Sequence, residues 1–240
     1  MASASFCKHR LSIITGHYGT GKTEFAVNLA LALASDGEQV MVADLDVVNP
    51  YFRSYEQTET MQKEGVNTIV TSCGGVADIP AINPAVLSIF QNDTLHGVLD
   101  IGGDPIGARV LARFKPQLEK LDFDLFFVLN ANRPETATVE TAITYLEGIE
   151  RECLQKVTGI VNNTHLCTLT TPEEVLKGAE LARALPEKTG LPIVCHAAHK
   201  RFAPALQEKL SEPVFPMEIY MKKPWEITNC EEDDNSWQEK

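Results

Sequence analysis

The sequence predicts an α/β fold in which a mostly parallel sheet is covered by helices on both faces. Short apolar runs alternate with amphipathic stretches along the chain, as in strands that are connected by crossover helices. Several apolar runs, such as residues 125–129, contain almost no polar residue, which is typical of strands buried on both faces. The 240 residues suffice for one sizeable core. We therefore expect a single domain over residues 1–228.

Each element follows from its local pattern. Strands are predicted at residues 11–15, 39–44, 68–71, 97–100, 125–130, 157–162 and 192–195. Helices are predicted at residues 22–34, 84–91, 108–121, 135–151, 172–188 and 203–210. Asp36-Gly37 is typical of a helix end, and Thr171-Pro172 of a helix start. The acidic segment 229–240 lacks apolar periodicity, so a flexible C-terminal tail is expected there.

The composition excludes several classes of protein. A net charge of −12 without a basic stripe argues against direct binding to nucleic acid or to an anionic membrane. The six cysteines include no C-x-x-C pair, and Cys153, Cys167 and Cys195 lie in apolar or strand-like runs, where cysteine is commonly a small buried hydrophobe. Residues 1–10 lack the apolar run of a signal peptide. A cytoplasmic protein is expected.

A phosphate-binding motif follows the first predicted strand and opens the first predicted helix. It satisfies G-x-x-x-x-G-K-[ST]. Glycines permit a tight turn whose backbone N–H groups bind phosphate oxygens, and the helix N-terminus adds a favourable field. We expect Lys22 to reach the β- and γ-phosphates and the Thr23 hydroxyl to ligate Mg²⁺. The expected nucleotide contacts are Gly16, His17, Tyr18, Gly19, Thr20, Gly21, Lys22 and Thr23.

Carboxylates follow two later strands. Asp44 and Asp46 project to the same side of an extended chain, so one of them is expected to hold Mg²⁺ through water and the other to orient the attacking water. Asp100 ends an apolar strand in the Walker-B pattern, which places it near Mg²⁺. Gly103 follows closely, and its N–H is expected to contact the γ-phosphate in a loop that can act as a switch. Asp104 is either part of this site or a turn or helix-cap residue.

The base is expected to lie near the end of the strand at 157–162. Asn162 is the candidate base contact, because a carboxamide both donates and accepts hydrogen bonds, and Asn163 is expected to line the same site. Guanine-specific loops usually read N-K-x-D, whose Asp pairs with guanine. The segment 162–165 has no such Asp, which favours ATP over GTP.

Further candidates lie on or near this side of the sheet: Arg53, Arg109, Arg113, Arg133, Cys73, His196 and His199. Arg133 is the best-placed arginine, while Arg109 and Arg113 are interpreted as solvated helix charges, with γ-phosphate sensing or a partner contact as the alternative. Cys73 is interpreted as a structural or free thiol rather than a cluster ligand. The two histidines lack a third ligand, so no metal site is predicted there.

The order of the phosphate loop, Asp-x-Asp, Asp-x-Gly-Gly and Asn at successive strand ends resembles the MinD/ParA/CobQ-type P-loop ATPases of the SIMIBI class. The resemblance covers roughly residues 10–200. It implies a three-layer P-loop NTPase with about seven to eight mostly parallel strands. It also implies that Lys22, Thr23, Asp46 and Asp100 are the catalytic and Mg²⁺ residues, and that Asn162 is a base contact. Homodimers that sandwich nucleotide are common in this family.

His17 departs from the family pattern. Many members carry a lysine here that reaches the partner's phosphates, whereas histidine is shorter and mostly neutral at cytosolic pH. The alternative is a loop histidine that packs on Tyr18 or Glu24. The loop also resembles that of nickel-insertion GTPases, but those carry the guanine-binding Asp and metal-binding Cys or His clusters that this chain lacks.

The expected function is Mg²⁺-dependent binding and hydrolysis of ATP, coupled to action on a partner protein, for example in cofactor or metalloenzyme maturation. The alternative is an ATP-dependent ligase or kinase for small molecules, resembling dethiobiotin synthetase or the cobyrinic-acid amidases. A third interpretation is a nucleotide-dependent scaffold with little hydrolysis. The chain offers no second domain of substrate-binding size, which favours action on a partner.

Overall fold

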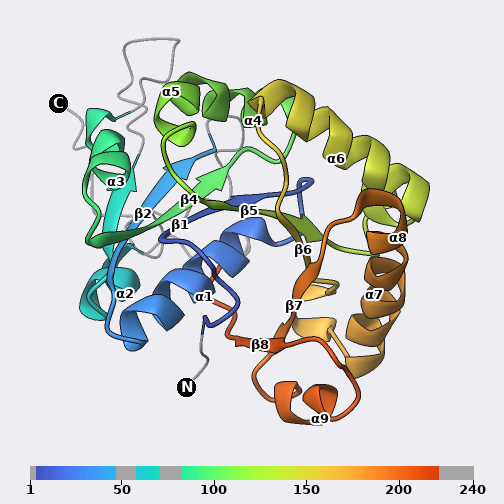
Figure 1. Cartoon of the computed structure of the whole chain (residues 1–240). Coiled ribbons are helices and arrows are strands. Elements are labelled where there is room, and N and C mark those ends of the chain that lie inside the picture. Colours follow the sequence, from blue (N-terminus) through green and yellow to red (C-terminus); the bar gives the residue numbers. More distant parts are fainter. Residues whose placement is uncertain (1–3, 47–57, 71–82, 222–240) are drawn as a thin grey trace, which may run out of the picture.

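The computed structural model describes residues 4–46, 58–70 and 83–221. In this part of the chain, eight strands form one sheet in the order β3-β2-β4-β1-β5-β6-β7-β8, and every neighbouring pair is parallel (Figure 1). The strands are β1 (Leu11–Thr15), β2 (Gln39–Leu45), β3 (Asn67–Val70), β4 (Leu95–Ile101), β5 (Asp124–Leu129), β6 (Gly159–Asn162), β7 (Ile193–His199) and β8 (Val214–Met217). The α/β fold with a parallel sheet is confirmed. The predicted tail at 229–240 lies outside the described residues.

Helices cover both faces of this sheet. They are α1 (Lys22–Ser35), α2 (Thr58–Lys63), α3 (Leu87–Gln91), α4 (Pro105–Ala108), α5 (Lys115–Leu118), α6 (Val139–Cys153), α7 (Pro172–Ala184), α8 (Pro186–Thr189) and α9 (Ala203–Gln207). Single turns or short runs of 3-10 helix lie at Pro84–Val86, Arg109–Phe114, Pro134–Thr136 and Cys167–Leu169. None of the helices in the described part has both the length and the apolarity that a bilayer crossing requires.

Two predicted helices are interrupted, and prolines mark the breaks. The predicted helix 108–121 is instead α4, a 3-10 run and α5, with Pro116 in the first turn of α5. The predicted helix 172–188 is divided into α7 and α8, and Pro186 starts the second piece. Proline lacks the N–H that an uninterrupted helix needs, whereas a helix start tolerates it. The prediction missed α2 and β8, which are both short and carry little periodicity.

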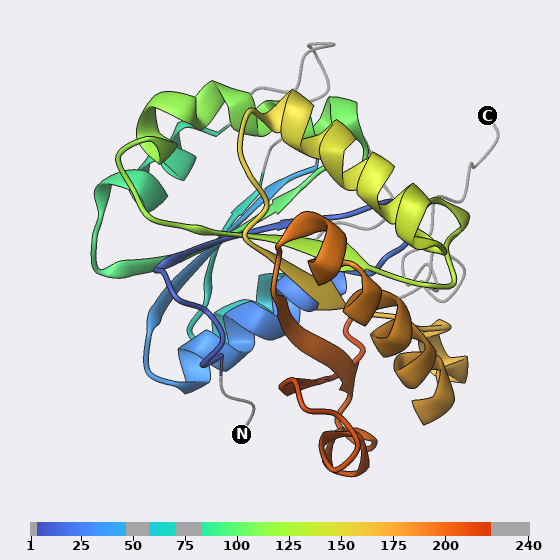
Figure 2. The ribbon, with the colours of Figure 1, turned by 45° about the vertical axis from the view of Figure 1, so that its right-hand side comes forward.

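Alternating strand residues form two apolar cores. One face of the sheet packs against α3, α4 and α6, and the other packs against α1 and α2. Figure 2 shows α6 and α1 on opposite sides of the sheet. Ala43, Leu45, Leu99 and Ile101 belong to the α6 side. Because strand residues alternate between faces, the intervening Asp44 and Asp100 project to the α1 side.

The strand order brings the polar strand ends together. β1 is central, between β4 and β5, so the chain that leaves β1 emerges at the point where the sheet order reverses. Ligands of open α/β sheets bind at such points, beyond the carboxyl ends of the strands. Asp44 is in register with Asp100 on the adjacent strand, and Asp100 is in register with Ile14 of β1. The two carboxylates therefore lie next to each other, on the β4 side of the chain that leaves β1.

Candidate nucleotide-binding site

The loop of residues 16–21 connects β1 to α1, and its shape requires glycine. Gly16, Gly19 and Gly21 have φ angles of 147°, 77° and 80°. A Cβ at Gly16 would lie 2.4 Å from the Val128 carbonyl oxygen. Residues with side chains rarely adopt this part of φ space, so the glycines are structural requirements here. Thr20 closes the loop by donating from its hydroxyl to the His17 carbonyl at 2.8 Å.

The N-terminus of α1 is open to an anion. Gly21 is its N-cap residue, and no side chain of the described chain caps the helix. The first N–H groups of a helix have no partner within it, and the helix dipole favours negative charge at this end. Lys22 and Thr23 are the first two helical residues, and both are buried. The segment therefore has the geometry of a phosphate-binding loop.

Lys22 lies among carboxylates that come from the ends of two strands, β2 and β4. Its Nζ is 3.3 Å from Oδ2 of Asp46, and both side chains are buried. The Asp46 N–H donates to Oδ1 of Asp44 at 3.0 Å. Asp100 is 1% exposed, and its carboxylate faces the Thr23 hydroxyl and the Lys22 ammonium, with no other hydrogen-bond partner among the described residues. Burial raises the pKa of Asp100 to about 7; Lys22 opposes this rise and Asp44 adds to it.

These residues fit a magnesium ion. The buried Asp100 carboxylate beside the Thr23 hydroxyl offers the hard oxygen ligands that Mg²⁺ prefers. In the described part of the chain, no group of three or more Asp, Glu, His or Cys side chains is arranged to hold a metal alone. Mg²⁺ usually takes one or two protein carboxylates and completes its shell with phosphate and water. Thr23, Asp44 and Asp100 are the side chains that would hold it.

The loop after β4 passes directly over the phosphate loop. A Cβ at Gly103 would lie 2.8 Å from the Gly16 carbonyl oxygen and 3.0 Å from Nζ of Lys22. Only glycine allows the backbone at residue 103 to come this close to the phosphate loop. The loop after β4 thus lies against the Lys22 ammonium group, which is expected to bind the terminal phosphates. Asp104 caps α4, since its Oδ1 accepts the N–H of Gly107. Of the two roles that the sequence left open for Asp104, the structure shows the helix cap.

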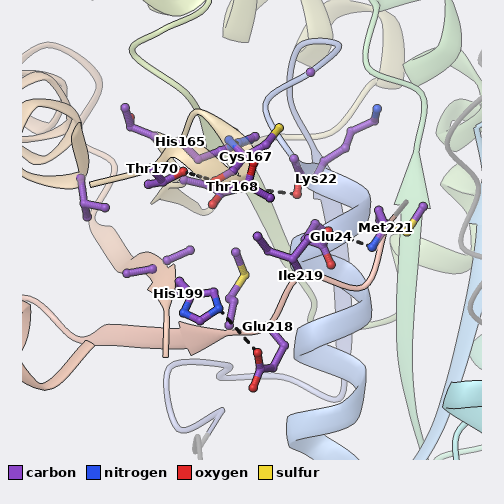
Figure 3. A pocket seen from close by; sticks show the side chains of 18 of the residues that line it. Lys22, Glu24, His165, Cys167, Thr168, Thr170, His199, Glu218, Ile219 and Met221 are labelled. Carbon is purple, nitrogen blue, oxygen red and sulfur yellow. Dashed lines mark hydrogen bonds and ion pairs between the residues drawn. The ribbon is translucent and has the colours of Figure 1, made fainter. Parts of the chain in front are cut away.

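A pocket of about 640 Å³ extends from Lys22 and Thr23 to the loops that follow β6, β7 and β8 (Figure 3). Its lining is largely apolar, as in most nucleotide and cofactor sites. The apolar lining residues are Val175, Ala197, Ala198, Phe202, Met217, Ile219 and Met221. The pocket begins at the phosphate loop and has a largely apolar lining. It is therefore the candidate site for the base and ribose.

Polar contacts attach this pocket to the phosphate loop. Asn163 donates through Nδ2 to the carbonyl oxygens of Thr20 at 2.9 Å and Gly21 at 3.3 Å. Arg133 donates through Nε to the Gly19 carbonyl at 2.9 Å. Burial, together with the charge of Arg133, lowers the pKa of His165 to about 4, so this pocket residue is neutral. The loops after β5 and β6 therefore support the phosphate loop from outside.

The predicted base contact at Asn162 differs from the observed arrangement. Asn162 is fully buried and does not line the pocket. Its Nδ2 pairs with the Val175 carbonyl at 3.1 Å and with Nδ1 of His196 at 3.0 Å, and its Oδ1 accepts both the N–H and the hydroxyl of Thr164. Each polar atom of the amide thus has a partner inside the protein. Asn163, one residue later, is the asparagine that lines the pocket.

His17 makes contacts that the sequence did not suggest. Its ring meets the Tyr145 ring of α6 edge to face, with centroids 4.9 Å apart and planes at 78°. Its Nδ1 lies 3.6 Å from Oε2 of Glu135. Glu24, the alternative neighbour, instead accepts the N–H groups of Tyr220 and Met221 at 2.7 and 3.1 Å. The sequence carried no signal for Tyr145.

The remaining candidates are dispersed. Arg109 pairs with Glu152 of α6 at 2.7 Å, in agreement with a charge on the helix surface. His199 lies 3.7 Å from Glu218 at the pocket rim. Cys167 is exposed, so its predicted burial is wrong; it lies in a loop turn with a φ of 53°, not in an apolar strand. Arg53 and Cys73 lie outside the described residues.

Fold and site together define a P-loop nucleotide-binding protein. The family model described as the CobQ/CobB/MinD/ParA nucleotide binding domain matches residues 11–168. The chain belongs to this family. No curated protein sequence matches the chain.

Solved structures with the same fold include signal recognition particle receptors. Chloroplast FtsY from Physcomitrella patens has a TM-score of 0.51 and 16% identity, over 76% of this chain and 56% of its own. FtsY from Elizabethkingia anophelis in complex with GDP has a TM-score of 0.49 and 15% identity, over 78% of this chain and 56% of its own. Each alignment covers less than two thirds of the neighbour's length. At these identities the likeness concerns the fold alone.

Proposed function

We propose that this protein binds ATP with Mg²⁺ in the cytoplasm, hydrolyses it, and uses the resulting conformational change to act on a partner protein. The observation that carries the proposal is the buried Asp100 carboxylate, which faces Lys22 and Thr23 at an uncapped helix N-terminus. Lys22 and Thr23 offset the cost of burying this carboxylate only in part, because its pKa is still raised to about 7. A bound divalent cation would compensate the buried negative charge.

Each residue has a role in this proposal. Lys22 and the loop N–H groups stabilise the negative charge that develops on the phosphates. Thr23, Asp44 and Asp100 would hold Mg²⁺, which would supply further positive charge to the bound phosphates. When Lys22 turns from Asp46 to the phosphates, the Asp46 carboxylate becomes available to orient the attacking water and to accept its proton. The ion pair with Lys22 thus keeps Asp46, the proposed general base, from binding water until nucleotide is present.

The acidic residues of the pocket lining support our proposal of adenine over guanine. Guanine needs a carboxylate that accepts its N1 and N2 hydrogens. The acidic pocket residues among those described are Glu24 and Glu218. Glu24 already accepts two backbone N–H groups, and Glu218 pairs with Lys200 and His199. Neither carboxylate is therefore positioned to pair with guanine.

Exposed apolar side chains beside the site support action on a partner. Tyr18 in the phosphate loop is 48% exposed, and Ile106 directly after the Gly102-Gly103 loop is 69% exposed. Leu169, on the loop after β6, is 77% exposed. Exposed apolar side chains on loops around a ligand site can contribute to a contact surface. A second copy of this chain is one candidate partner.

Equilibrium binding of ATP, GTP and ADP, with and without Mg²⁺, tests the nucleotide assignment. We expect ATP to bind at least tenfold more tightly than GTP, and Mg²⁺ to strengthen binding. Tighter GTP binding would contradict the assignment. Steady-state hydrolysis is then measured alone, with candidate proteins and with small carboxylic acids or alcohols. Turnover that requires a small acceptor, and yields a phosphorylated or ligated product, would replace partner action with ligase or kinase activity.

A further inference from the structure

Tyr145 connects the two loops that face the phosphates. It lies on α6, on the sheet face opposite α1 (Figure 2). Its hydroxyl donates to the carbonyl oxygen of Gly103, and its ring meets the ring of His17. One side chain therefore contacts both the second residue of the phosphate loop and the glycine that lies over Lys22. The expected γ-phosphate position lies between these two loops.

The segment that follows Gly103 also lies along α6. Arg109 donates to Glu152 from Nε at 2.8 Å and from Nη2 at 2.7 Å. A Cβ at Gly148 would lie 3.6 Å from Cγ of Pro105, so α4 passes close to α6 at a residue without a side chain. These contacts are on the outer part of the segment. The Tyr145 hydroxyl is the contact nearest the phosphate loop.

The surroundings keep this hydroxyl protonated. Burial raises the pKa of Tyr145 above its usual value, and the charges of Asp104 and Glu135 raise it further. The hydroxyl is therefore a hydrogen-bond donor at any pH near neutrality. A donor suits the carbonyl of Gly103, which can only accept. This bond restricts the backbone rotation that two adjacent glycines would otherwise allow.

We propose that Tyr145 is a positioning residue that holds the Gly102-Gly103 loop over the phosphate loop and transmits the presence of a γ-phosphate to α6. The inference rests on the proposed function, since it requires a nucleoside triphosphate at Lys22. When the Gly103 N–H meets the γ-phosphate, the backbone at Gly103 adjusts, and the Tyr145 hydroxyl moves with the carbonyl that it holds. A nucleoside diphosphate lacks that contact, so it leaves α6 unaffected.

The variant Tyr145→Phe removes the hydroxyl and keeps the ring against His17. We expect ADP affinity to stay within about twofold of wild type, whereas the affinity for a non-hydrolysable ATP analogue and kcat fall about three- to tenfold, the range of one hydrogen bond. Thr144→Ala is the matched control, because the exposed Thr144 hydroxyl bonds only within α6, to the Glu140 carbonyl. It should leave all three quantities unchanged.

Amide hydrogen exchange provides a readout that a loss of stability alone would not give. In wild type, the ATP analogue should slow exchange relative to ADP in residues 102–108 and in residues 139–146 of α6. In Tyr145→Phe the response of residues 139–146 should disappear while that of residues 102–108 persists. A variant that retains both the α6 response and the preference for triphosphate would overturn the inference and leave the proposed function intact. A wild-type protein that binds neither nucleotide would overturn the proposed function itself.

Discussion

In the proposed function, phosphate binding depends most on Lys22. It is a buried cation whose nearest counter-ion, Asp46, lies at 3.3 Å, and it lies at the uncapped end of α1. We expect Lys22→Ala to lower ATP affinity at least 100-fold, because both the charge and its position at the phosphates are lost. Isothermal titration calorimetry measures this change.

The control for this prediction is Lys115→Ala, which removes an exposed lysine that pairs only with Glu119 one helical turn away. It should bind ATP like wild type. Circular dichroism should show that both variants are folded. A folded Lys22→Ala protein with unchanged ATP affinity would exclude residues 16–23 as the phosphate site.

We expect Asp100 to lower the stability of the nucleotide-free protein and to be needed for Mg²⁺-dependent hydrolysis. Burial raises the pKa of its carboxylate and destabilises the charged form, although Lys22 and Thr23 oppose this effect. Asp100→Asn keeps the shape and removes the charge. We expect the melting temperature of the nucleotide-free protein to rise by a few degrees, and the Mg²⁺ dependence of ATP hydrolysis to be lost.

Thermal melts without nucleotide and hydrolysis over a range of Mg²⁺ concentrations test both parts. Glu119→Gln, an exposed acidic position, is the control and should change neither quantity. If Asp100→Asn hydrolyses ATP with wild-type Mg²⁺ dependence, Asp100 is not a magnesium ligand.

At the scale of elements, the strand cores were predictable and the strand ends were not. Continuous apolar runs and the phosphate-loop motif located β1, β2, β4 and β5, because burial on both faces leaves a strong pattern. The face of a strand-end residue depends on its register, and a shift of one residue reverses it. This is why Asn163 rather than Asn162 lines the pocket. Asn162 faces His196 of the adjacent strand, a pairing that a single sequence does not contain.

We expect His196, the partner of Asn162, to make the stability of the protein depend on pH. Nδ1 of His196 accepts from Asn162, and Nε2 faces Glu212, which also pairs with Arg183. Burial lowers the pKa of His196, and Glu212 only partly offsets this. The unfolded chain therefore takes up a proton near pH 6.5 that the folded chain resists, so stability is lost as pH falls below 6.5.

We expect the melting temperature of wild type to fall by several degrees more between pH 7 and pH 5 than that of His196→Gln. Part of the fall should remain in the variant, because the pKa of His165 is also lowered, to about 4. Protonation of this residue in the unfolded chain therefore also lowers the melting temperature as pH falls. Differential scanning calorimetry at closely spaced pH values measures both slopes. Parallel slopes in the two proteins would show that the pKa of His196 is the same in the folded and the unfolded chain.

At the scale of the whole molecule, the site is assembled from segments far apart in the sequence. The phosphate loop after β1, the carboxylates of β2 and β4, and the pocket loops after β6, β7 and β8 meet at one edge of the sheet (Figures 1 and 3). Even the end of the described chain takes part, since Glu24 of α1 binds the backbone of residues 220 and 221. A ligand that bridges these segments must stabilise the fold as a unit.

Binding should therefore raise the melting temperature of the entire domain in one transition. A ligand at 100 times its dissociation constant stabilises the folded state by about 2.7 kcal/mol, which corresponds to a rise of roughly 5–10 °C for a domain of this size. We expect this rise with ATP and Mg²⁺. Chelation of Mg²⁺ should remove most of it, because Asp44 and Asp100 then repel the phosphates. Lys22→Ala should show no rise at the same concentrations. A rise that survives chelation in full would mean that the carboxylates do not act through a metal.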